Sequence, residues 1–78
     1  MHRSPVLYAG ASASLQRAMA EERRGDLSAA YASYRQAGLL YIADGRRDTA
    51  NAGMQLRARQ QAHKLLQKLE AMAAAATA

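Results

Sequence analysis

The spacing of small and aromatic residues in the middle of the chain most strongly constrains the fold. Such residues recur three and four positions apart, as Leu27, Ala30, Tyr34, Ala37 and Tyr41. An α-helix places this spacing on one face, and alternation of three and four is typical of a helix packed in an antiparallel bundle. Because two of these side chains are only methyl groups, we expect neighbouring helices to approach this one closely.

Two other segments have the same spacing. The earlier repeat is Tyr8, Ala11, Leu15 and Ala18, and the later one is Ala58, Ala62, Leu65, Leu69 and Met72. No run alternates apolar and polar residues as a half-buried strand does. The sequence therefore predicts an all-α protein, an antiparallel three-helix bundle in which the third helix covers the groove between the first two.

Capping residues predict the ends of the first helix, which we place at about 5–24. Ser4 suits an N-cap and Pro5 suits the first helical position, where its missing N–H costs nothing. Gly10 weakens the first turns, which leaves a start near Ser12 or Ser14 open. Gly25 is expected to end this helix.

The second and third helices are predicted at about 27–43 and 48–73. Asp26 is a good N-cap for the second helix. The stretch "ADGRRD" predicts a break, with Gly45 ending the second helix and Asp44 or Asp48 capping the third.

The 78 residues allow one domain, predicted at 1–74, and the alanine-rich residues 75–78 are expected to be a tail or the start of a linker. Without cysteine, no disulfide or thiolate metal site can hold the fold. No apolar run approaches the about 20 residues of a membrane span, and "PVLYAGASA" is too short and too weakly apolar for a signal peptide. We expect a cytoplasmic protein.

Residues that could carry chemistry are sparse. His63 has no histidine or carboxylate three or four positions away, which disfavours a metal site. The carboxylates of Glu21, Glu22 and Asp26 adjoin Arg23 and Arg24 and are predicted to form a solvated face. No nucleophile accompanies a base and no glycine-rich phosphate loop is present. We therefore expect no enzyme, no cofactor and no metal.

The net charge of +5 leaves acidic partners open. Arg57, Lys64 and Lys68 project within about 50° of one another at about 100° per residue, which makes a basic stripe. This stripe is either a solvated face or a contact for acidic peptides, tubulin tails, anionic lipid or phosphates. Nucleic acid is disfavoured because no aromatic platforms alternate with the charges.

Residues 18 to 37 resemble one tetratricopeptide unit. The matching positions are Ala18, Gly25-Asp26-Leu27, Ala30, Tyr34 and Ala37. Such units normally occur in tandem because one alone cannot bury its apolar face, and here the pattern occurs once. A tetratricopeptide-like module that packs on a larger protein, or self-associates, is therefore one interpretation.

One such hairpin followed by a third helix also resembles the MIT (microtubule-interacting and trafficking) domain, over about residues 5 to 72. The resemblance implies a three-helix adaptor, often endosome-associated, that recruits a larger parent protein by binding C-terminal tails of ESCRT-III-like proteins. One tail class lies as an amphipathic helix between helices 2 and 3, and another lies extended between helices 1 and 3.

Transferred to this chain, the resemblance implies a groove that binds the helical class of tail. Its lining is predicted to be Tyr31, Gly38, Ile42, Ala58, Ala62 and Leu66, with Gln67 and Glu70 at its edge. Gln67 stands where the family often has an acidic residue that pairs with arginine, and Glu70 is the nearest carboxylate. A basic module for nucleic acid or membrane surfaces is the remaining alternative.

Overall fold

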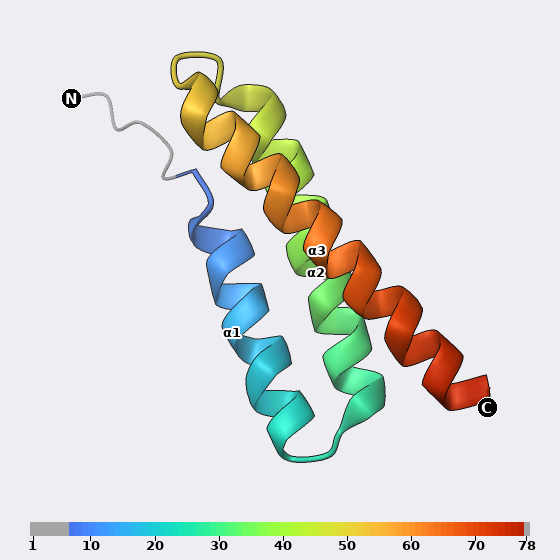
Figure 1. Cartoon of the computed structure of the whole chain (residues 1–78). Coiled ribbons are helices and arrows are strands. Elements are labelled where there is room, and N and C mark those ends of the chain that lie inside the picture. The colour runs from blue at the N-terminus through green and yellow to red at the C-terminus, as the bar shows by residue number, and fades with distance from the viewer. Residues whose placement is uncertain (1–6, 78) are drawn as a thin grey trace.

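A computed structural model describes residues 7–77, which form α1 (Ala9–Arg23), α2 (Leu27–Arg47) and α3 (Ala52–Thr77). Each helix runs antiparallel to the next along the chain (Figure 1). The described residues contain no strand. The predicted all-α, antiparallel three-helix bundle is confirmed.

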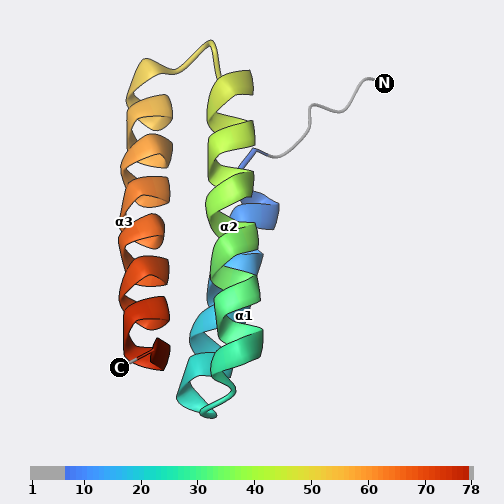
Figure 2. The ribbon, with the colours of Figure 1, turned by 90° about the vertical axis from the view of Figure 1, so that its right-hand side faces the viewer.

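The middle helix organises the bundle. α2 packs against α1 and against α3, whereas no Cα atom of α1 lies within 8 Å of one in α3. The Cα trace measures 50 × 23 × 13 Å, and Figure 2 shows α1 and α3 against different sides of α2. The sequence predicted that the third helix covers the groove between the first two. This prediction is wrong, because α3 packs along α2 alone.

The core is built mainly from alanine. Ala18, Ala30 and Ala37 are fully buried, and Tyr34 and Leu65 are the large side chains that join them. Methyl groups let α-helices approach closely, but each removes little apolar surface from water. The buried core is therefore thin, and no large side chain among the described residues is completely enclosed.

Two hydrogen bonds and a ring contact fix the position of Tyr8, the residue that precedes α1. Its amide donates a hydrogen bond to Asp44 Oδ2 at 2.9 Å, and its hydroxyl donates to Asp48 Oδ2 at 2.8 Å. The Tyr8 ring also stacks on that of Tyr41, with 6.2 Å between centroids. These contacts hold Tyr8 at a φ of 71°, outside the helical region, so α1 begins at Ala9 instead of residue 5. The predicted caps at residues 4 and 5 lie outside the described residues.

The turn between α1 and α2 matches its prediction. Gly25 has a φ of +81°, the left-handed conformation that ends helices and that glycine adopts without strain. The Asp26 carboxylate accepts a hydrogen bond from the Ala29 amide at 3.3 Å and caps α2.

The break after α2 differs from its prediction. α2 continues through Gly45 to Arg47, so the prediction that this glycine ends the helix is wrong. Gly45 is buried, and a Cβ atom on it would lie 3.5 Å from that of Ala58. Its small size therefore serves the contact with α3.

The third helix is shifted toward the C-terminus. The Asn51 side chain accepts a hydrogen bond from the Met54 amide at 3.0 Å, and α3 begins at Ala52 instead of residue 48. Alanine's high helix propensity carries it to Thr77, beyond the predicted end near 73. None of the helices in residues 7–77 has the length and apolarity needed to cross a membrane.

Candidate functional site

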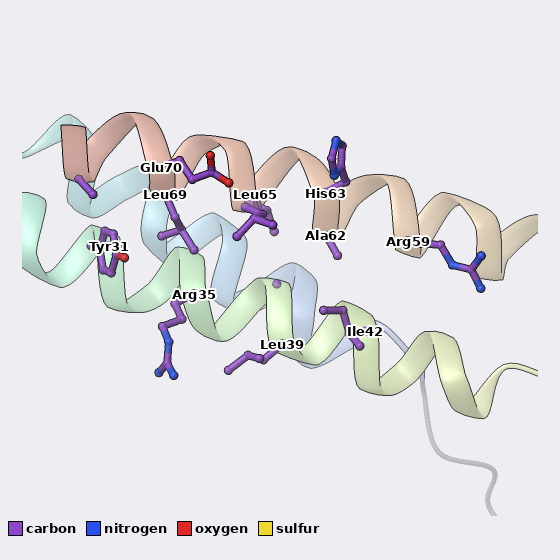
Figure 3. Close-up of a pocket in the computed structure, with 13 residues that line it drawn as sticks. Tyr31, Arg35, Leu39, Ile42, Arg59, Ala62, His63, Leu65, Leu69 and Glu70 are labelled. Atoms are coloured by element: carbon purple, nitrogen blue, oxygen red, sulfur yellow. The ribbon is translucent and has the colours of Figure 1, made fainter. Parts of the chain in front are cut away.

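A groove of about 520 Å³ runs between α2 and α3 (Figure 3). All of its lining residues come from these two helices, so α1 takes no part in it. We call it the α2–α3 groove, and its lining is Tyr31, Arg35, Gly38, Leu39, Ile42, Arg59, Ala62, His63, Leu65, Leu66, Leu69, Glu70 and Ala73.

Small residues form the floor of the groove. Gly38 and Ala62 are buried there, and a Cβ atom on Gly38 would lie 3.8 Å from the Leu65 Cβ. The two helices therefore approach closely along this line. The larger side chains on either side have no third helix to cover them, and they stand as walls.

The walls carry large apolar side chains that remain in contact with water. Tyr31, Leu39, Ile42 and Leu66 are between 39% and 53% exposed. They are four of the eight large apolar side chains left exposed among residues 7–77, and they gather along one groove. Contiguous exposed apolar surface with a polar rim is typical of a protein-interaction site.

The rim of the groove is charged. Arg35, Arg59, His63 and Glu70 border the apolar walls. Figure 3 shows Glu70 near the end marked by Tyr31, and Arg59 near the other end. The single ion pair among the described residues joins Lys68 to Glu22, so it includes none of these rim residues.

Six of the eight residues predicted for the groove line it, namely Tyr31, Gly38, Ile42, Ala62, Leu66 and Glu70. Ala58 instead lies buried against Gly45 and does not line the groove. Gln67 lies on the outer face of α3, where its amide nitrogen is 3.3 Å from His63 Nε2.

Seven residues of the groove were not predicted from the sequence, namely Arg35, Leu39, Arg59, His63, Leu65, Leu69 and Ala73. Part of this set could have been found from spacing. Tyr31, Arg35, Leu39 and Ile42 follow one another at four, four and three residues, which places them on one face of α2. Of these four residues, Tyr31 and Ile42 were predicted to line the groove, and Arg35 and Leu39 were not.

The three residues of the predicted basic stripe have different surroundings. Lys68 pairs with Glu22 at 2.7 Å and lies 5.6 Å from the centre of the Tyr34 ring. Arg57 borders a recess of about 260 Å³ beside Tyr8. Lys64 is exposed on the outer face of α3. Because Lys68 already has an internal partner, the stripe is not a continuous set of free cations.

The predicted solvated acidic face also needs correction, because Glu22 joins all three helices. Its carboxylate accepts hydrogen bonds from the Tyr34 hydroxyl at 2.5 Å and from Lys68 Nζ at 2.7 Å. The hydrogen bonds from Lys68 and Tyr34 lower the pKa of Glu22 below its usual value. Burial, together with the Glu22 hydrogen bond, raises the pKa of Tyr34 to about 12.

The neighbouring carboxylate is engaged as well. Glu21 accepts a hydrogen bond from the Ser33 hydroxyl at 2.6 Å. Both carboxylates therefore hold helices together. Within residues 7–77, no group of three or more acidic, histidine or cysteine side chains is arranged to hold a metal ion.

No protein-family model, curated protein or solved structure matches the chain significantly. The three-helix bundle is compatible with the architecture of the MIT domain, and none of these comparisons places the chain in that family.

Proposed function

We propose that the chain is a non-catalytic interaction module that holds an amphipathic helix of a partner protein in the α2–α3 groove. The exposed apolar walls of this groove carry the proposal. An amphipathic helix places residues at i, i+3, i+4 and i+7 on one face, which matches an elongated apolar trough between two helices. Burying the four wall side chains would remove from water half of the eight large apolar side chains that residues 7–77 leave exposed.

The resemblance to the MIT domain extends this proposal to a partner class. The guest would be the leucine-bearing C-terminal tail of an ESCRT-III-like protein, and the module would recruit its parent protein to endosomal membranes. The three antiparallel helices and the position of the groove between the second and third support this assignment. Glu70, at the groove rim, takes the acidic role that Gln67 cannot fill from the outer face.

One observation favours a second candidate, a tetratricopeptide-like packing or self-association module. Each helix packs against its sequence neighbour, as in stacked helical repeats, and within residues 7–77 α3 packs against no helix other than α2. Self-association through the α2–α3 groove would make the apparent mass rise with protein concentration. Sedimentation velocity across a wide concentration range separates this candidate from peptide binding.

The test of the principal proposal is an NMR titration of the isotope-labelled chain with ESCRT-III tail peptides. We expect shift changes clustered at Tyr31, Gly38, Ala62 and Leu66, with a micromolar dissociation constant, equivalent to about 8 kcal/mol. An absence of shifts in the groove at millimolar peptide would reject the proposal. Shifts that disappear steeply with added salt would instead indicate a contact dominated by charge, as with phosphates.

A matched pair of variants sharpens the test. Leu66→Asp places a charge on the groove wall, whereas Leu27→Asp changes an equally exposed leucine that does not line the groove. We expect the first variant to weaken peptide binding at least roughly tenfold, because a buried apolar anchor contributes on the order of 2 kcal/mol. The second should bind like the parent chain. Equal loss in both variants would place binding elsewhere.

A further inference from the structure

A recess beside the α2–α3 loop is a second candidate site. We infer that it binds the phosphate group of a phosphomonoester between the guanidinium groups of Arg46 and Arg59. The recess has a volume of about 280 Å³, and its lining is Tyr41, Ile42, Gly45, Arg46, Gln55 and Arg59. It meets the α2–α3 groove at Ile42 and Arg59, which Figure 3 shows toward the loop end of the groove. Phosphate binding here does not require a partner helix in the groove.

The two arginines of the recess come from different helices. Arg46 lies in the last turn of α2, and Arg59 lies near the start of α3. Both are exposed, and neither forms an ion pair within residues 7–77. A guanidinium group binds a phosphate through two parallel N–H···O hydrogen bonds. Two such groups on opposite walls of one recess therefore suit a single phosphate held between them.

The acidic residues near the loop do not enter the recess. No carboxylate is part of its lining. Asp44 and Asp48 accept hydrogen bonds from Tyr8, on the side of α2 that packs against α1. Asp44 and Arg46 are two positions apart, so they project about 200° apart around the helix. The positive charge of the recess is therefore not cancelled by a carboxylate within it.

Gln55 masks a group that would otherwise repel an anion. Carbonyl groups at the C-terminal end of a helix carry partial negative charge. Here the Gly45 carbonyl oxygen accepts hydrogen bonds from Gln55 Nε2 at 2.8 Å and from the Asp48 amide at 3.3 Å. The carboxamide of Gln55 has a second N–H. Gln55 therefore adds a hydrogen-bond donor to the recess as well as covering the carbonyl.

The charge and size of the recess favour a phosphate over a carboxylate. A phosphomonoester carries a charge of about −1.5 to −2 at pH 7, which matches two guanidinium groups, whereas a carboxylate carries a single charge. At about 30 Å³ per water molecule, the recess has room for roughly nine. That is enough for a phosphate group and the first atoms of the group that it esterifies. Tyr41 and Ile42 supply apolar surface for those atoms.

An NMR titration of the isotope-labelled full chain with glycerol 3-phosphate, at constant ionic strength, tests the site. We expect shift changes concentrated at Arg46, Gln55 and Arg59, with a dissociation constant on the order of 1 mM because both arginines are exposed to water. Acetate at the same concentration should shift these signals less. Changes spread evenly over the arginines and lysines, with an equal response to acetate, would mean an adventitious ion only and would overturn the site.

Two arginines of α3 provide a matched pair of variants. Arg59→Gln and Arg57→Gln each remove one charge from exposed positions two residues apart, but Arg57 borders the recess beside Tyr8 and not this one. We expect Arg59→Gln to weaken phosphate binding roughly three- to tenfold, and Arg57→Gln to change it by less than about twofold. Arg46→Gln should repeat the larger loss from the opposite wall. Equal weakening by Arg57→Gln would overturn the site.

Vesicles distinguish a lipid headgroup from a soluble phosphoester as the source of the phosphate. Co-sedimentation compares phosphatidylcholine vesicles that contain phosphatidic acid, which is a phosphomonoester, with phosphatidylserine vesicles of matched net charge. A preference for phosphatidic acid that Arg59→Gln removes would support the site with a lipid as its ligand. Binding of glycerol 3-phosphate without that preference would support it with a soluble ligand. If neither bound, the phosphate site would be overturned, and the groove would remain testable with tail peptides.

Discussion

The contact between α1 and α2 is closed, whereas the contact between α2 and α3 opens into a groove. Between α1 and α2 the fully buried residues are alanines, and hydrogen bonds from Ser33 and Tyr34 to Glu21 and Glu22 close the edge. Between α2 and α3 the floor is equally small at Gly38, but leucine, isoleucine and tyrosine flank it. The size of the flanking side chains, and whether another helix covers them, decides which contact remains open.

The difference between these two contacts predicts which residues affect folding stability and which affect the binding of a partner. The closed contact contains the fully buried alanines and the Glu22 network, so changes there should act on folding. The groove walls are about half exposed, so changes there should act mainly on a partner. The predictions below test this division, beginning with the largest expected effect.

Enlarging a residue of the closed contact should be the most damaging change. Ala37 is fully buried between helices, and Ala37→Leu would force them apart at a cost of about 1–3 kcal/mol or more. In a domain this small, that is a large part of the free energy of unfolding. Urea unfolding monitored by circular dichroism measures the loss.

Ala32→Leu is the matched control, because Ala32 lies on the exposed face of the same helix. We expect this variant to stay within about 0.5 kcal/mol of the parent chain. Similar losses for the two variants would mean that α2 is sensitive to leucine anywhere, and that close packing at Ala37 is not the cause.

Removing a hydroxyl from the Glu22 network should have an intermediate effect. Tyr34→Phe retains the buried ring but deletes the donor to Glu22, which should cost about 1 kcal/mol. Tyr31→Phe is the control, because the Tyr31 hydroxyl has no hydrogen-bond partner among the described residues. If the two variants unfolded at the same urea concentration, the Glu22 network would not contribute to stability.

The smallest expected effect is the loss of the stability contributed by the ionised Glu22 carboxylate as the pH falls. Because the folded state lowers the pKa of Glu22, ionisation of this group stabilises the fold above its unfolded-state value near 4.5. That contribution is lost as the pH falls through the lower, folded-state pKa. The stability difference between the parent chain and Glu22→Gln should therefore shrink from pH 7 toward strongly acidic pH in urea titrations. A difference that is constant with pH would contradict this role.

Local features of the chain could be predicted well. The three helices follow from the spacing of small and apolar residues, and the turn at Gly25 and Asp26 follows from the conformations that these two residues favour. The prediction that Gly45 ends α2 was wrong because a glycine near a helix break commonly serves as a C-cap. Here its small size lets Ala58 of α3 pack against α2. The role of Glu22 was missed because its partners Tyr34 and Lys68 lie 12 and 46 residues away.

By itself the sequence determined the class of the fold, since helical spacing, caps and the lack of alternation act within a few residues of one another. The resemblance to the MIT domain assigned eight residues to a groove between the second and third helices, and six of them line the α2–α3 groove. The packing of α3 along α2 alone, which leaves the groove uncovered and brings Lys68 to Glu22, became visible in the three-dimensional fold. Those outcomes depend on how whole helices pack against one another, and residue spacing within a single helix does not specify that arrangement.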